Sequence, residues 1–383
     1  MAPNPPTRLL LITRNFPPLW GGMERLNWHL AAELAKTCEV RVIGPAGAAA
    51  YAPAGMAVRE APLLPLRAFL WHAARLARTE ARTWRPDVVL AGSGLTAPLA
   101  LWAARACGAR TAAYVHGLDL VVPHPVYRAL WRPALRRIDT VVANSRATAA
   151  LAEGIGIAKG RIAIVHPGVE LPAPEPAARA RFRAAHGIAD TAPLLLSVGR
   201  LTARKGLLEF VRDVLPRIAA QRPDVLLAIV GDAPAHALYA QAQTPASIQA
   251  AADAAGVGAR VQFLGKLDES ALHDAYTAAD VHVFPIRDLP NDPEGFGMVA
   301  VEAAAHGLPT VAYATGGVVD AVRDGASGRL VPPSDTAAFA QAVIATLQAP
   351  PSAEALRAFA AEFAWERFGQ RVTDALARNI GER

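Results

Sequence analysis

Short runs of apolar, β-branched residues alternate along the whole chain with longer, alanine-rich stretches of helical periodicity. Most of the apolar runs are continuous, which is typical of parallel strands that helices cover on both faces. Strand–helix alternation of this kind predicts right-handed βαβ units. We expect strands at residues 8–16, 39–44, 87–93, 110–117, 140–145, 162–168, 194–200, 226–232, 260–266, 281–286 and 309–314.

The chain is long for a single hydrophobic core, since 383 residues favour two domains. A proline-rich segment at 168–179 is typical of a linker, a stretch at 353–379 has helical periodicity, and 234–249 is expected to be a surface excursion. The predicted fold class is α/β, with two doubly wound parallel sheets whose carboxyl edges face each other across one cleft. The expected parts are a first domain at 1–170, a second domain at 171–360 and a C-terminal helix at 361–383 that crosses back to the first domain.

Composition narrows the class of protein. Hydrophobic residues make up 52% of the chain and charged residues 19%, as in globular proteins. The two cysteines, Cys38 and Cys107, are too few for a disulfide framework and lack metal-ligand spacing, which fits a reducing cytoplasm. The longest uncharged stretch, 88–104, has 17 residues and is short for a membrane-spanning helix. The N-terminal segment lacks the features of a signal peptide, so we expect a cytoplasmic protein.

Charge is distributed unevenly along the chain. Residues 1–170 contain 20 Lys and Arg against 10 Asp and Glu, whereas the remaining residues contain 19 against 23. A basic first half indicates an anionic surface as its partner. A general bias toward arginine and alanine in the encoding proteome explains the asymmetry equally well.

A predicted amphipathic helix within 62–86 concentrates this positive charge. At 100° per residue its arginines fall within an arc of about 80°, with Trp71 inside the arginine face and apolar side chains opposite. Such a stripe suits an anionic membrane surface or a phosphate-bearing acceptor, and an ordinary helix with solvated arginines is the alternative. The side chains expected on this acceptor or membrane side are Arg67, Trp71, Arg75, Arg78 and Arg82.

The segment DPEGFGMVAVEAAAHGLP, residues 292–309, contains the most informative pattern. Its first glycines allow a tight turn, after which a helix is predicted from Met298. The free N–H groups at the start of such a helix attract an anion. Glu294 precedes this helix and Glu302 lies about one turn inside it. The two carboxylates could form an acid–base pair, be solvated separately, or each bind a different part of one ligand.

Further candidate residues follow strands at the same topological place. Arg200 and Lys205 come after one strand, and two cations there suit a diphosphate. Gly21 and Gly22 open a helix after the first strand and present backbone N–H groups. His116 ends another strand. Solvated cations, an ordinary turn and a structural histidine are the alternatives for each feature alone, but together these features indicate one anion-binding site.

The motifs also occur in a known order. The sequence EGFGMVAVE at 294–302 matches the Glu-x7-Glu motif of family 4 retaining glycosyltransferases, and FPPLWGG, VHG, NS, HPGVE, GR…RKG and LVPPSD stand in family order around it. Over nearly its whole length the chain therefore resembles a family 4 glycosyltransferase of the GT-B fold, with two Rossmann-like domains. The stretch FPIRDLPNDPEGFGMV at 284–299 is similar to the phosphatidylinositol mannosyltransferase branch and to related polysaccharide mannosyltransferases.

The resemblance implies a role for each charged candidate. Glu294 would contact hydroxyls of the donor sugar, and His116 would contact that sugar near the reacting centre. Glu302 would accept hydrogen bonds from the ribose hydroxyls. Arg200 and Lys205 would neutralise the diphosphate. The implied catalytic residues are Glu294, His116, Arg200 and Lys205.

The rest of the implied donor site is largely backbone. The start of the predicted helix would hold the sugar and the distal phosphate, the Gly-Gly turn would close over the phosphates, and Lys266 and Leu267 would lie near the base. The implied donor-binding residues are Gly21, Gly22, Arg200, Lys205, Lys266, Leu267, Glu294, Gly295, Phe296, Gly297, Met298, Val299 and Glu302.

A family member would move a hexose from a nucleotide-diphosphate sugar with retention of anomeric configuration. We expect mannose from GDP-mannose, with a UDP-hexose as the alternative, and a lipid-linked or glycan acceptor of cell-envelope or polysaccharide biosynthesis. Preorganised cations and a helix N-terminus can stabilise a leaving diphosphate, and the chain has no Asp-x-Asp triplet, so no cofactor and no metal are expected. The expected location is cytoplasmic, with peripheral attachment to the inner face of the plasma membrane left open.

Three rival functions fit less well. AGSGLTA at 91–97 approximates the fingerprint of an NAD-dependent oxidoreductase but lacks an acidic residue about 20 positions later. The basic half suggests a nucleic-acid-binding protein, but no recognisable module is present and aromatic residues make up only 6%. A GT-B isomerase or hydrolase of nucleotide sugars is disfavoured by the Gly-Gly turn and the basic acceptor face.

Overall fold

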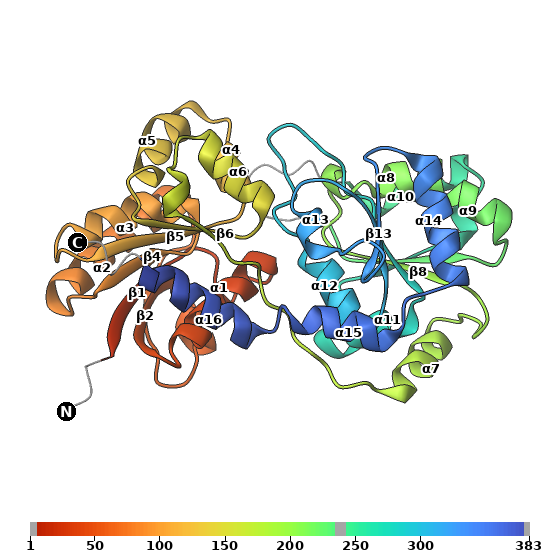
Figure 1. The fold of residues 1–383 in the computed structure, drawn as a ribbon, viewed down its shortest axis with the longest axis horizontal. Coiled ribbons are helices and arrows are strands. Elements are labelled where there is room, and N and C mark those ends of the chain that lie inside the picture. Colours follow the sequence, from red (N-terminus) through yellow and green to blue (C-terminus); the bar gives the residue numbers. More distant parts are fainter. Residues whose placement is uncertain (1–5, 234–242, 379–383) are drawn as a thin grey trace. The chain divides into compact units, whose positions relative to one another are not determined.

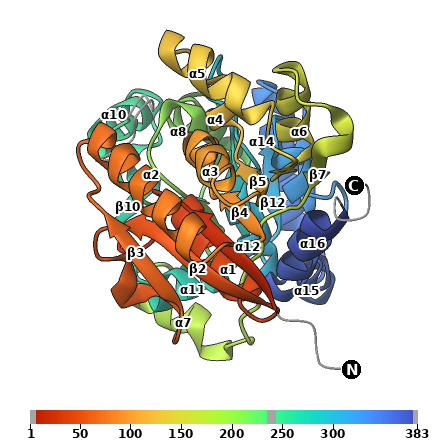
Figure 2. The same ribbon diagram turned by 90° about the vertical axis from the view of Figure 1, so that its left-hand side faces the viewer.

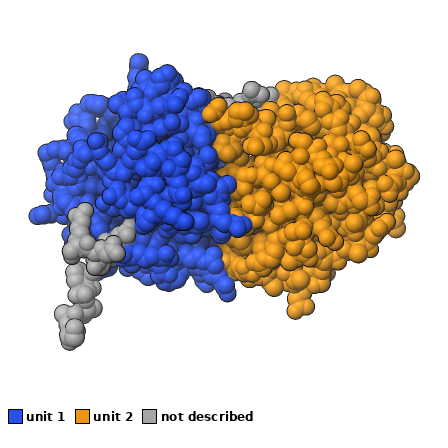
Figure 3. Space-filling view, turned by 45° about the horizontal axis from the view of Figure 1, so that its top comes forward, with its two compact units in different colours: residues 1–168, 365–383 blue, residues 169–364 orange. Residues whose placement is uncertain are grey.

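The computed structural model of the protein describes residues 6–233 and 243–378. The chain forms two compact units, unit 1 (Met1–Gly168 with Trp365–Arg383) and unit 2 (Val169–Ala364), which Figure 3 shows in different colours. Each unit has a parallel sheet flanked by helices (Figure 1). The chain passes between the units after residue 168 and again after residue 364, whereas the sequence placed these boundaries after 170 and 360.

In the described residues the sheet of unit 1 has seven parallel strands in the order β3-β2-β1-β4-β5-β6-β7. The strands are β1 (Thr7–Ile12), β2 (Cys38–Pro45), β3 (Ala57–Ala61), β4 (Val88–Ala91), β5 (Arg110–Val115), β6 (Thr140–Ala143) and β7 (Ile162–Ile164). The helices are α1 (Gly22–Leu34), α2 (Leu66–Thr83), α3 (Ala97–Ala104), α4 (Leu118–Val121), α5 (Pro125–Leu135), α6 (Arg146–Gly154) and α16 (Trp365–Ala377). Short 3-10 turns are η1 (Ala48–Tyr51), η2 (Gly94–Thr96) and η3 (Lys159–Arg161).

The strands of unit 1 bury alternate side chains on the two faces of the sheet. Ala113 on β5 belongs to the core that contains Ala73 and Ala77 of α2. Its neighbour Tyr114 points to the opposite side, where its ring centroid lies 6.0 Å from that of Phe368 on α16. Helices α2 and α3 therefore cover one face, as Figure 2 shows, and α1 and α16 pack together on the other.

The sheet of unit 2 has, among the described residues, six parallel strands in the order β10-β9-β8-β11-β12-β13. The strands are β8 (Leu194–Val198), β9 (Leu226–Val230), β10 (Val261–Gly265), β11 (Val281–Phe284), β12 (Thr310–Tyr313) and β13 (Gly328–Val331). The helices are α7 (Pro176–Ala185), α8 (Leu207–Glu209), α9 (Leu215–Gln221), α10 (Pro245–Ala254), α11 (Glu269–Ala278), α12 (Met298–Ala305), α13 (Val318–Ala321), α14 (Thr336–Gln348) and α15 (Ala353–Ala361). Also present are η4 (Ala203–Lys205), the π-helical turn η5 (Phe210–Val214) and η6 (Gly258–Arg260).

All eleven expected strands are present, and their parallel pairing is confirmed. Two further strands, β3 and β13, lie at sheet edges and were not predicted. The sequence AVREA of β3 is mostly exposed, so it lacks the continuous apolar pattern of a covered strand. Strand β13 is only four residues long and includes the exposed Arg329.

Three expected segments are wrong in detail. The helical stretch at 353–379 is broken by a turn at 362–364, where Ala364 bridges to Val169 and the N–H of Val169 donates to Phe363 O at 2.8 Å. Helix α7 begins inside the predicted linker at Pro176, since proline is favoured in the first turn of a helix. Helix α10 begins at Pro245 inside the predicted excursion, and residues 234–242 lie outside the described part of the chain.

Both sheets have a topological switch point, where the strand order reverses direction. In unit 1 it lies between β1 and β4, and in unit 2 between β8 and β11. Doubly wound sheets bind their ligands just beyond the carboxyl ends of the strands at this point. The loops after these four strands are therefore where candidate functional residues are expected.

Candidate functional site

In unit 2 the two strands at the switch point lead to the predicted charged residues. Strand β8 is followed by Arg200 and by the turn η4, which contains Lys205. The neighbouring strand β11 leads into the loop at 285–297, which contains Glu294 and ends at helix α12. Parallel pairing of the two strands thus joins residues that are 89 positions apart in the sequence.

Lys205 and Glu294 form an ion pair at this place. Lys205 Nζ lies 2.8 Å from Glu294 Oε2, and the two side chains are only 14% and 11% exposed. Arg204 flanks the pair, with Nε 3.7 Å from the same oxygen and an N–H that donates to Pro293 O at 2.6 Å. The Lys205 ammonium also lies 4.7 Å from the centre of the Phe284 ring, which is a cation–π contact.

The surroundings keep Glu294 ionised. Burial would by itself raise the pKa of Glu294, but Arg204 and Lys205 outweigh it and lower the pKa to about 2. Burial lowers the pKa of Lys205 below the ordinary lysine range, and Glu294 opposes that shift. The carboxylate is stabilised by several cations, whereas the ammonium has one anionic partner and two arginines near it. Glu294 is therefore a hydrogen-bond acceptor at neutral pH and not a proton donor.

The loop that contains Glu294 is held from behind by the loop after β12. Gly317 N–H donates to Glu294 O at 2.9 Å, and a Cβ on Gly317 would lie 2.0 Å from Gly295 O. Gly297 caps helix α12 with φ of 98°, a left-handed conformation that favours glycine. The helix begins at Met298, as the sequence predicted, and directs its first N–H groups toward the loop side.

Glu302 lies inside α12 and is not a solvated helix residue, because it is only 9% exposed. Its Oε2 accepts a hydrogen bond from the hydroxyl of Tyr276 on α11 at 3.0 Å. The two glutamates thus have separate partners, Lys205 for Glu294 and Tyr276 for Glu302. This arrangement favours two ligand-holding groups over an acid–base pair.

The remaining donor candidates of unit 2 differ in exposure. Arg200 and Lys266 are exposed after β8 and β10, and Leu267 is half-buried. Among the residues at the start of α12 the first three are buried and the next two half-buried. They are Gly295, Phe296, Gly297, Met298 and Val299.

In unit 1 Gly21 caps α1 and Gly22 is its first residue, and both are exposed. His116 follows β5, and its ring is buried next to β4. His116 Nε2 lies 3.0 Å from Gly92 O, and because a carbonyl only accepts, Nε2 carries the proton. In the neutral ring Nδ1 then has the lone pair. His116 N–H donates to Asp119 Oδ1 at 2.9 Å.

Asp119 also holds the neighbouring loop, since Gly94 N–H donates to its Oδ2 at 2.7 Å. The buried Asn27 of α1 donates to Gly92 O at 3.2 Å, the same carbonyl that His116 contacts. These bonds tie the ends of β4 and β5 to the first helix. His116 is thus fixed in position and in tautomer.

The predicted basic helix exists as α2, with Phe69 and Ala73 buried on the opposite face. Trp71 is 55% exposed, and the Arg75 guanidinium lies 4.7 Å from the centre of its ring. Arg78 stacks in the same way on Trp102 of α3 at 4.5 Å. The other two arginines of the expected stripe, Arg67 and Arg82, are exposed.

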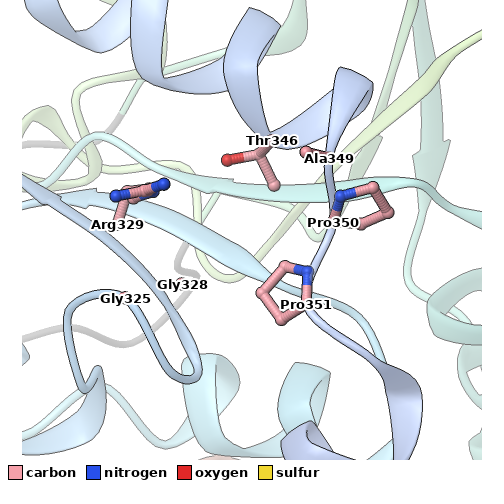
Figure 4. A pocket seen from close by; sticks show the side chains of 7 residues that line it. All are labelled: Gly325, Gly328, Arg329, Thr346, Ala349, Pro350 and Pro351. Carbon is pink, nitrogen blue, oxygen red and sulfur yellow. The ribbon is translucent and has the colours of Figure 1, made fainter.

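Other clusters in the described residues do not form a second site of this kind. Glu175, His273 and Asp274 bring ligand atoms within 4.8 Å of one another, but Arg181 already pairs with both carboxylates. A cavity of about 150 Å³ is lined by Arg329, Thr346 and neighbouring glycines and prolines (Figure 4). It lies at the start of β13, whereas the charged residues above follow the carboxyl ends of their strands.

Sequence reasoning missed several residues of this site. Arg204 was not predicted as a site residue, although its neighbours Arg200 and Lys205 were. Gly317 belongs to a Gly-Gly pair after an apolar strand, which is the signal that also drew attention to Gly21 and Gly22. Tyr276 gives no local signal, because its partner lies on another helix. No helix among the described residues is long and apolar enough to cross a membrane.

Two family models match the chain, one in each half. The model for glycosyltransferase family 4 matches residues 20–172, and that for glycosyl transferases group 1 matches residues 178–363. A GDP-mannose-dependent alpha-(1-6)-phosphatidylinositol monomannoside mannosyltransferase from Mycolicibacterium smegmatis is 32% identical, over 96% of this chain and 98% of the relative. A D-inositol 3-phosphate glycosyltransferase from Mycolicibacterium gilvum is 35% identical over 68% of this chain and 55% of its own length.

Solved structures of similar fold cover nearly the whole chain. Anabaena HepE in complex with UDP has a TM-score of 0.78 and 19% identity, covering 97% of this chain and 100% of the other. Sucrose-phosphate synthase from Thermosynechococcus elongatus has a TM-score of 0.77 and 22% identity, covering 98% and 100%. At these identities the likeness shows a shared fold, and the expected GT-B architecture of two Rossmann-like domains is confirmed.

Proposed function

Since the chain belongs to glycosyltransferase family 4, we propose that it transfers mannose from GDP-mannose to a lipid-linked or glycan acceptor, with retention of configuration and without a metal ion. The transferase activity and the fold follow from family membership. The choice of mannose and GDP rests on the relative that is named GDP-mannose-dependent and is 32% identical over 96% of this chain.

One observation supports the site most directly. Arg200, Lys205 and the start of α12 converge at the switch point of unit 2. Guanidinium, ammonium and the N–H groups of a helix start are the groups that bind diphosphates. When the glycosidic bond to the diphosphate breaks, negative charge develops on the leaving oxygen. Fixed cations at that position stabilise it without a metal ion.

Glu294 is proposed to hold the sugar end of the donor. Its pKa of about 2 keeps it ionised, so it accepts hydrogen bonds from sugar hydroxyls and does not protonate the leaving group. Lys205 Nζ, 2.8 Å from its Oε2, is then shared between the carboxylate and the diphosphate. One cation thereby links the two ends of the donor.

His116 is proposed to contact the donor sugar through Nδ1. Because Nε2–H donates to Gly92 O at 3.0 Å, the neutral ring offers a lone pair at Nδ1, which accepts a hydroxyl proton. Asp119 fixes the backbone of His116 through its N–H at 2.9 Å. His116 is thus a hydrogen-bond acceptor toward the sugar.

The acceptor is proposed to be anionic or membrane-bound. Helix α2 presents Arg67, Arg75 and Arg82 together with the exposed Trp71. Arginine and tryptophan together favour the interface of an anionic membrane. The protein would then work as a peripheral protein at the inner face of the plasma membrane.

A thermal-shift panel of GDP-, UDP- and ADP-sugars tests the donor assignment. Binding to the folded state raises the melting temperature, and GDP-mannose is expected to give the largest shift. A larger shift with UDP-glucose would replace mannose and GDP by a UDP-hexose. A shift with none of the nucleotides contradicts the donor site. Activity that disappears with EDTA and returns with Mg²⁺ contradicts the metal-free mechanism.

A further inference from the structure

We propose that Tyr276 is a positioning residue for Glu302, and that it fixes the carboxylate so that the enzyme distinguishes ribose from deoxyribose in its nucleotide. This inference rests on the proposed role of Glu302 toward the ribose hydroxyls. Tyr276 would not contact the nucleotide itself. It would act through the orientation of the carboxylate.

The contact between the two side chains is buried. Tyr276 is 2% exposed and Glu302 is 9% exposed, and the phenol donates to Oε2 at 3.0 Å. A carboxylate on a flexible glutamate side chain can rotate about its last bond. A hydrogen bond to one of its oxygens restricts that rotation, so the second oxygen presents a defined direction.

Tyr276 is itself held by a histidine. The rings of Tyr276 and His306 are stacked, with centroids 4.8 Å apart and planes inclined by 25°. His306 Nδ1 lies 2.7 Å from Glu302 O, so Nδ1–H donates to that carbonyl. His306 therefore joins the backbone of Glu302 to the ring whose hydroxyl reaches the Glu302 side chain.

A second histidine completes the arrangement. His306 Nε2 lies 3.1 Å from His273 Nδ1. Because His306 carries its proton on Nδ1, its Nε2 accepts and His273 Nδ1–H donates. Burial, with His273 and Arg357 adding to it, lowers the pKa of His306 to about 3. The stacked ring therefore stays neutral at neutral pH, and two hydrogen bonds join α11 to the C-terminal part of α12, Tyr276 with Glu302 and His273 with His306.

A fixed carboxylate gives better discrimination than a mobile one. A hydrogen bond to a charged group is lost when the ribose hydroxyl is missing, and one such bond changes affinity by about tenfold or more. If the carboxylate rotates freely, its ordering on binding costs free energy, and this reduces the gain from the hydroxyl. Removal of the Tyr276 hydroxyl should therefore reduce the preference for ribose, beyond any general effect on stability.

The test compares the dissociation constants of GDP and 2′-deoxy-GDP, measured by calorimetry on the full chain. The variants are Tyr276→Phe, Glu302→Ala and, as matched control, Tyr313→Phe, which removes a phenol hydroxyl from another buried tyrosine of unit 2. The ratio of the two constants is internal to each variant, so partial destabilisation does not obscure it. KM and kcat for the nucleotide sugar are measured in parallel.

For the parent and for Tyr313→Phe we expect GDP to bind about tenfold more tightly than the deoxy form. Tyr276→Phe should reduce that ratio to about threefold or less and raise KM while kcat changes by less than about twofold. An unchanged ratio in Tyr276→Phe, with a ratio that collapses in Glu302→Ala, overturns this inference alone. An unchanged ratio in Glu302→Ala overturns the ribose role of Glu302, and with it the inference.

Discussion

Lys205 Nζ and Glu294 Oε2 lie 2.8 Å apart, in loops that follow neighbouring strands of unit 2. The sequence assigned these residues to different parts of a donor, the diphosphate and the sugar. The structure pairs them with each other, in a place where both side chains are largely buried. A ligand at this site would thus bind to a preformed ion pair, and not to a lysine and a glutamate that are separate before binding.

Double substitution should reveal this pairing in the stability of unit 2. Lys205→Met and Glu294→Gln each leave a buried partner without its main counterpart, so each should lower the free energy of unfolding by about 2 to 4 kcal/mol. The loss of unfolding free energy in the double variant should be at least about 1 kcal/mol smaller than the sum of the losses in the two single variants. Urea denaturation of the four proteins measures the cycle. Additivity within about 0.5 kcal/mol would show that the pair is not formed.

Acid should destabilise unit 2 through buried histidines. Burial, with Lys205 adding to it, lowers the pKa of His282 to about 3, and the pKa of His306 is also about 3. Their ordinary value is 6.5. The unfolded chain therefore binds protons that the folded chain does not, between pH 6.5 and 3. The contribution of these histidines to the free energy of unfolding has its full value above pH 6.5 and is lost as the pH decreases through this window.

Each of these histidines contributes up to about 1.4 kcal/mol per pH unit within the window. Glu294 contributes to the pH dependence at lower pH. Its pKa in the folded protein is about 2, below the ordinary 4.5, so its contribution to stability is lost only as the pH falls from 4.5 toward 2. Urea unfolding at about pH 7, 5.5 and 4.5 measures the slope. His306→Gln should reduce the slope by about a third, because His29 of unit 1, whose pKa burial lowers to about 4, contributes in the same pH range as His282 and His306. Constant stability over this range would contradict the neutral, buried state of both rings.

Arg183 should be a strong determinant of stability. It is fully buried, pairs with Asp280 Oδ2 at 2.9 Å and donates to four backbone carbonyls. Arg183→Met leaves these acceptors buried and unpaired, and we expect a loss of about 3 to 5 kcal/mol. Arg212→Met removes an exposed partner of Asp213 and should cost about 0.5 kcal/mol or less. Similar losses in both variants would contradict the buried role of Arg183.

Gly317→Ala should misplace the loop that contains Glu294. The new Cβ would lie 2.0 Å from Gly295 O, although φ of −76° is acceptable for alanine. The loop must shift, and a displacement of about 1 Å at a reacting centre can cost about a hundredfold in kcat/KM. Gly154→Ala is the control, since its Cβ meets nothing within 4 Å. Full activity of Gly317→Ala would show that this loop does not position the donor.

The basic face of α2 should govern binding to anionic vesicles. Each arginine near such a surface contributes about 1 kcal/mol. The triple change Arg67→Gln, Arg75→Gln and Arg82→Gln, all at exposed positions, should therefore weaken co-sedimentation with phosphatidylserine vesicles by about a hundredfold.

A matched variant removes three exposed arginines of unit 2, Arg212, Arg217 and Arg329. It lowers the net charge equally and should leave vesicle binding nearly unchanged. Equal binding of the parent to anionic and neutral vesicles would exclude α2 as a membrane contact.

The sequence predicted the sheets well because their strands are covered on both faces. A run such as LLLSV in β8 has to be apolar throughout when helices pack on either side. The start of α12 was also predictable, since Gly297 requires a left-handed conformation just before an alanine-rich run. In contrast, the edge strand β3 is mostly exposed and does not need a continuous apolar sequence, so the hydrophobic pattern did not predict it.

The contacts of the candidate site were harder to predict. Lys205 and Glu294 are 89 positions apart, and only the adjacency of β8 and β11 brings them together. The same holds for Tyr276 and Glu302, which meet across two helices. A single sequence contains the residue types of a site, but strand order and helix packing decide which of them are neighbours.

The return of the chain to unit 1 has a consequence for its synthesis. Helix α16 packs on α1, where Trp365 stacks on His29 with centroids 3.8 Å apart, so the earliest part of unit 1 needs a helix that the ribosome adds after unit 2. Unit 2, residues 169–364, is continuous and can fold as soon as it emerges. Unit 1 is thus begun first and completed last, and a chain truncated after Ala364 would release a complete unit 2 joined to a unit 1 that lacks the helix packed against α1.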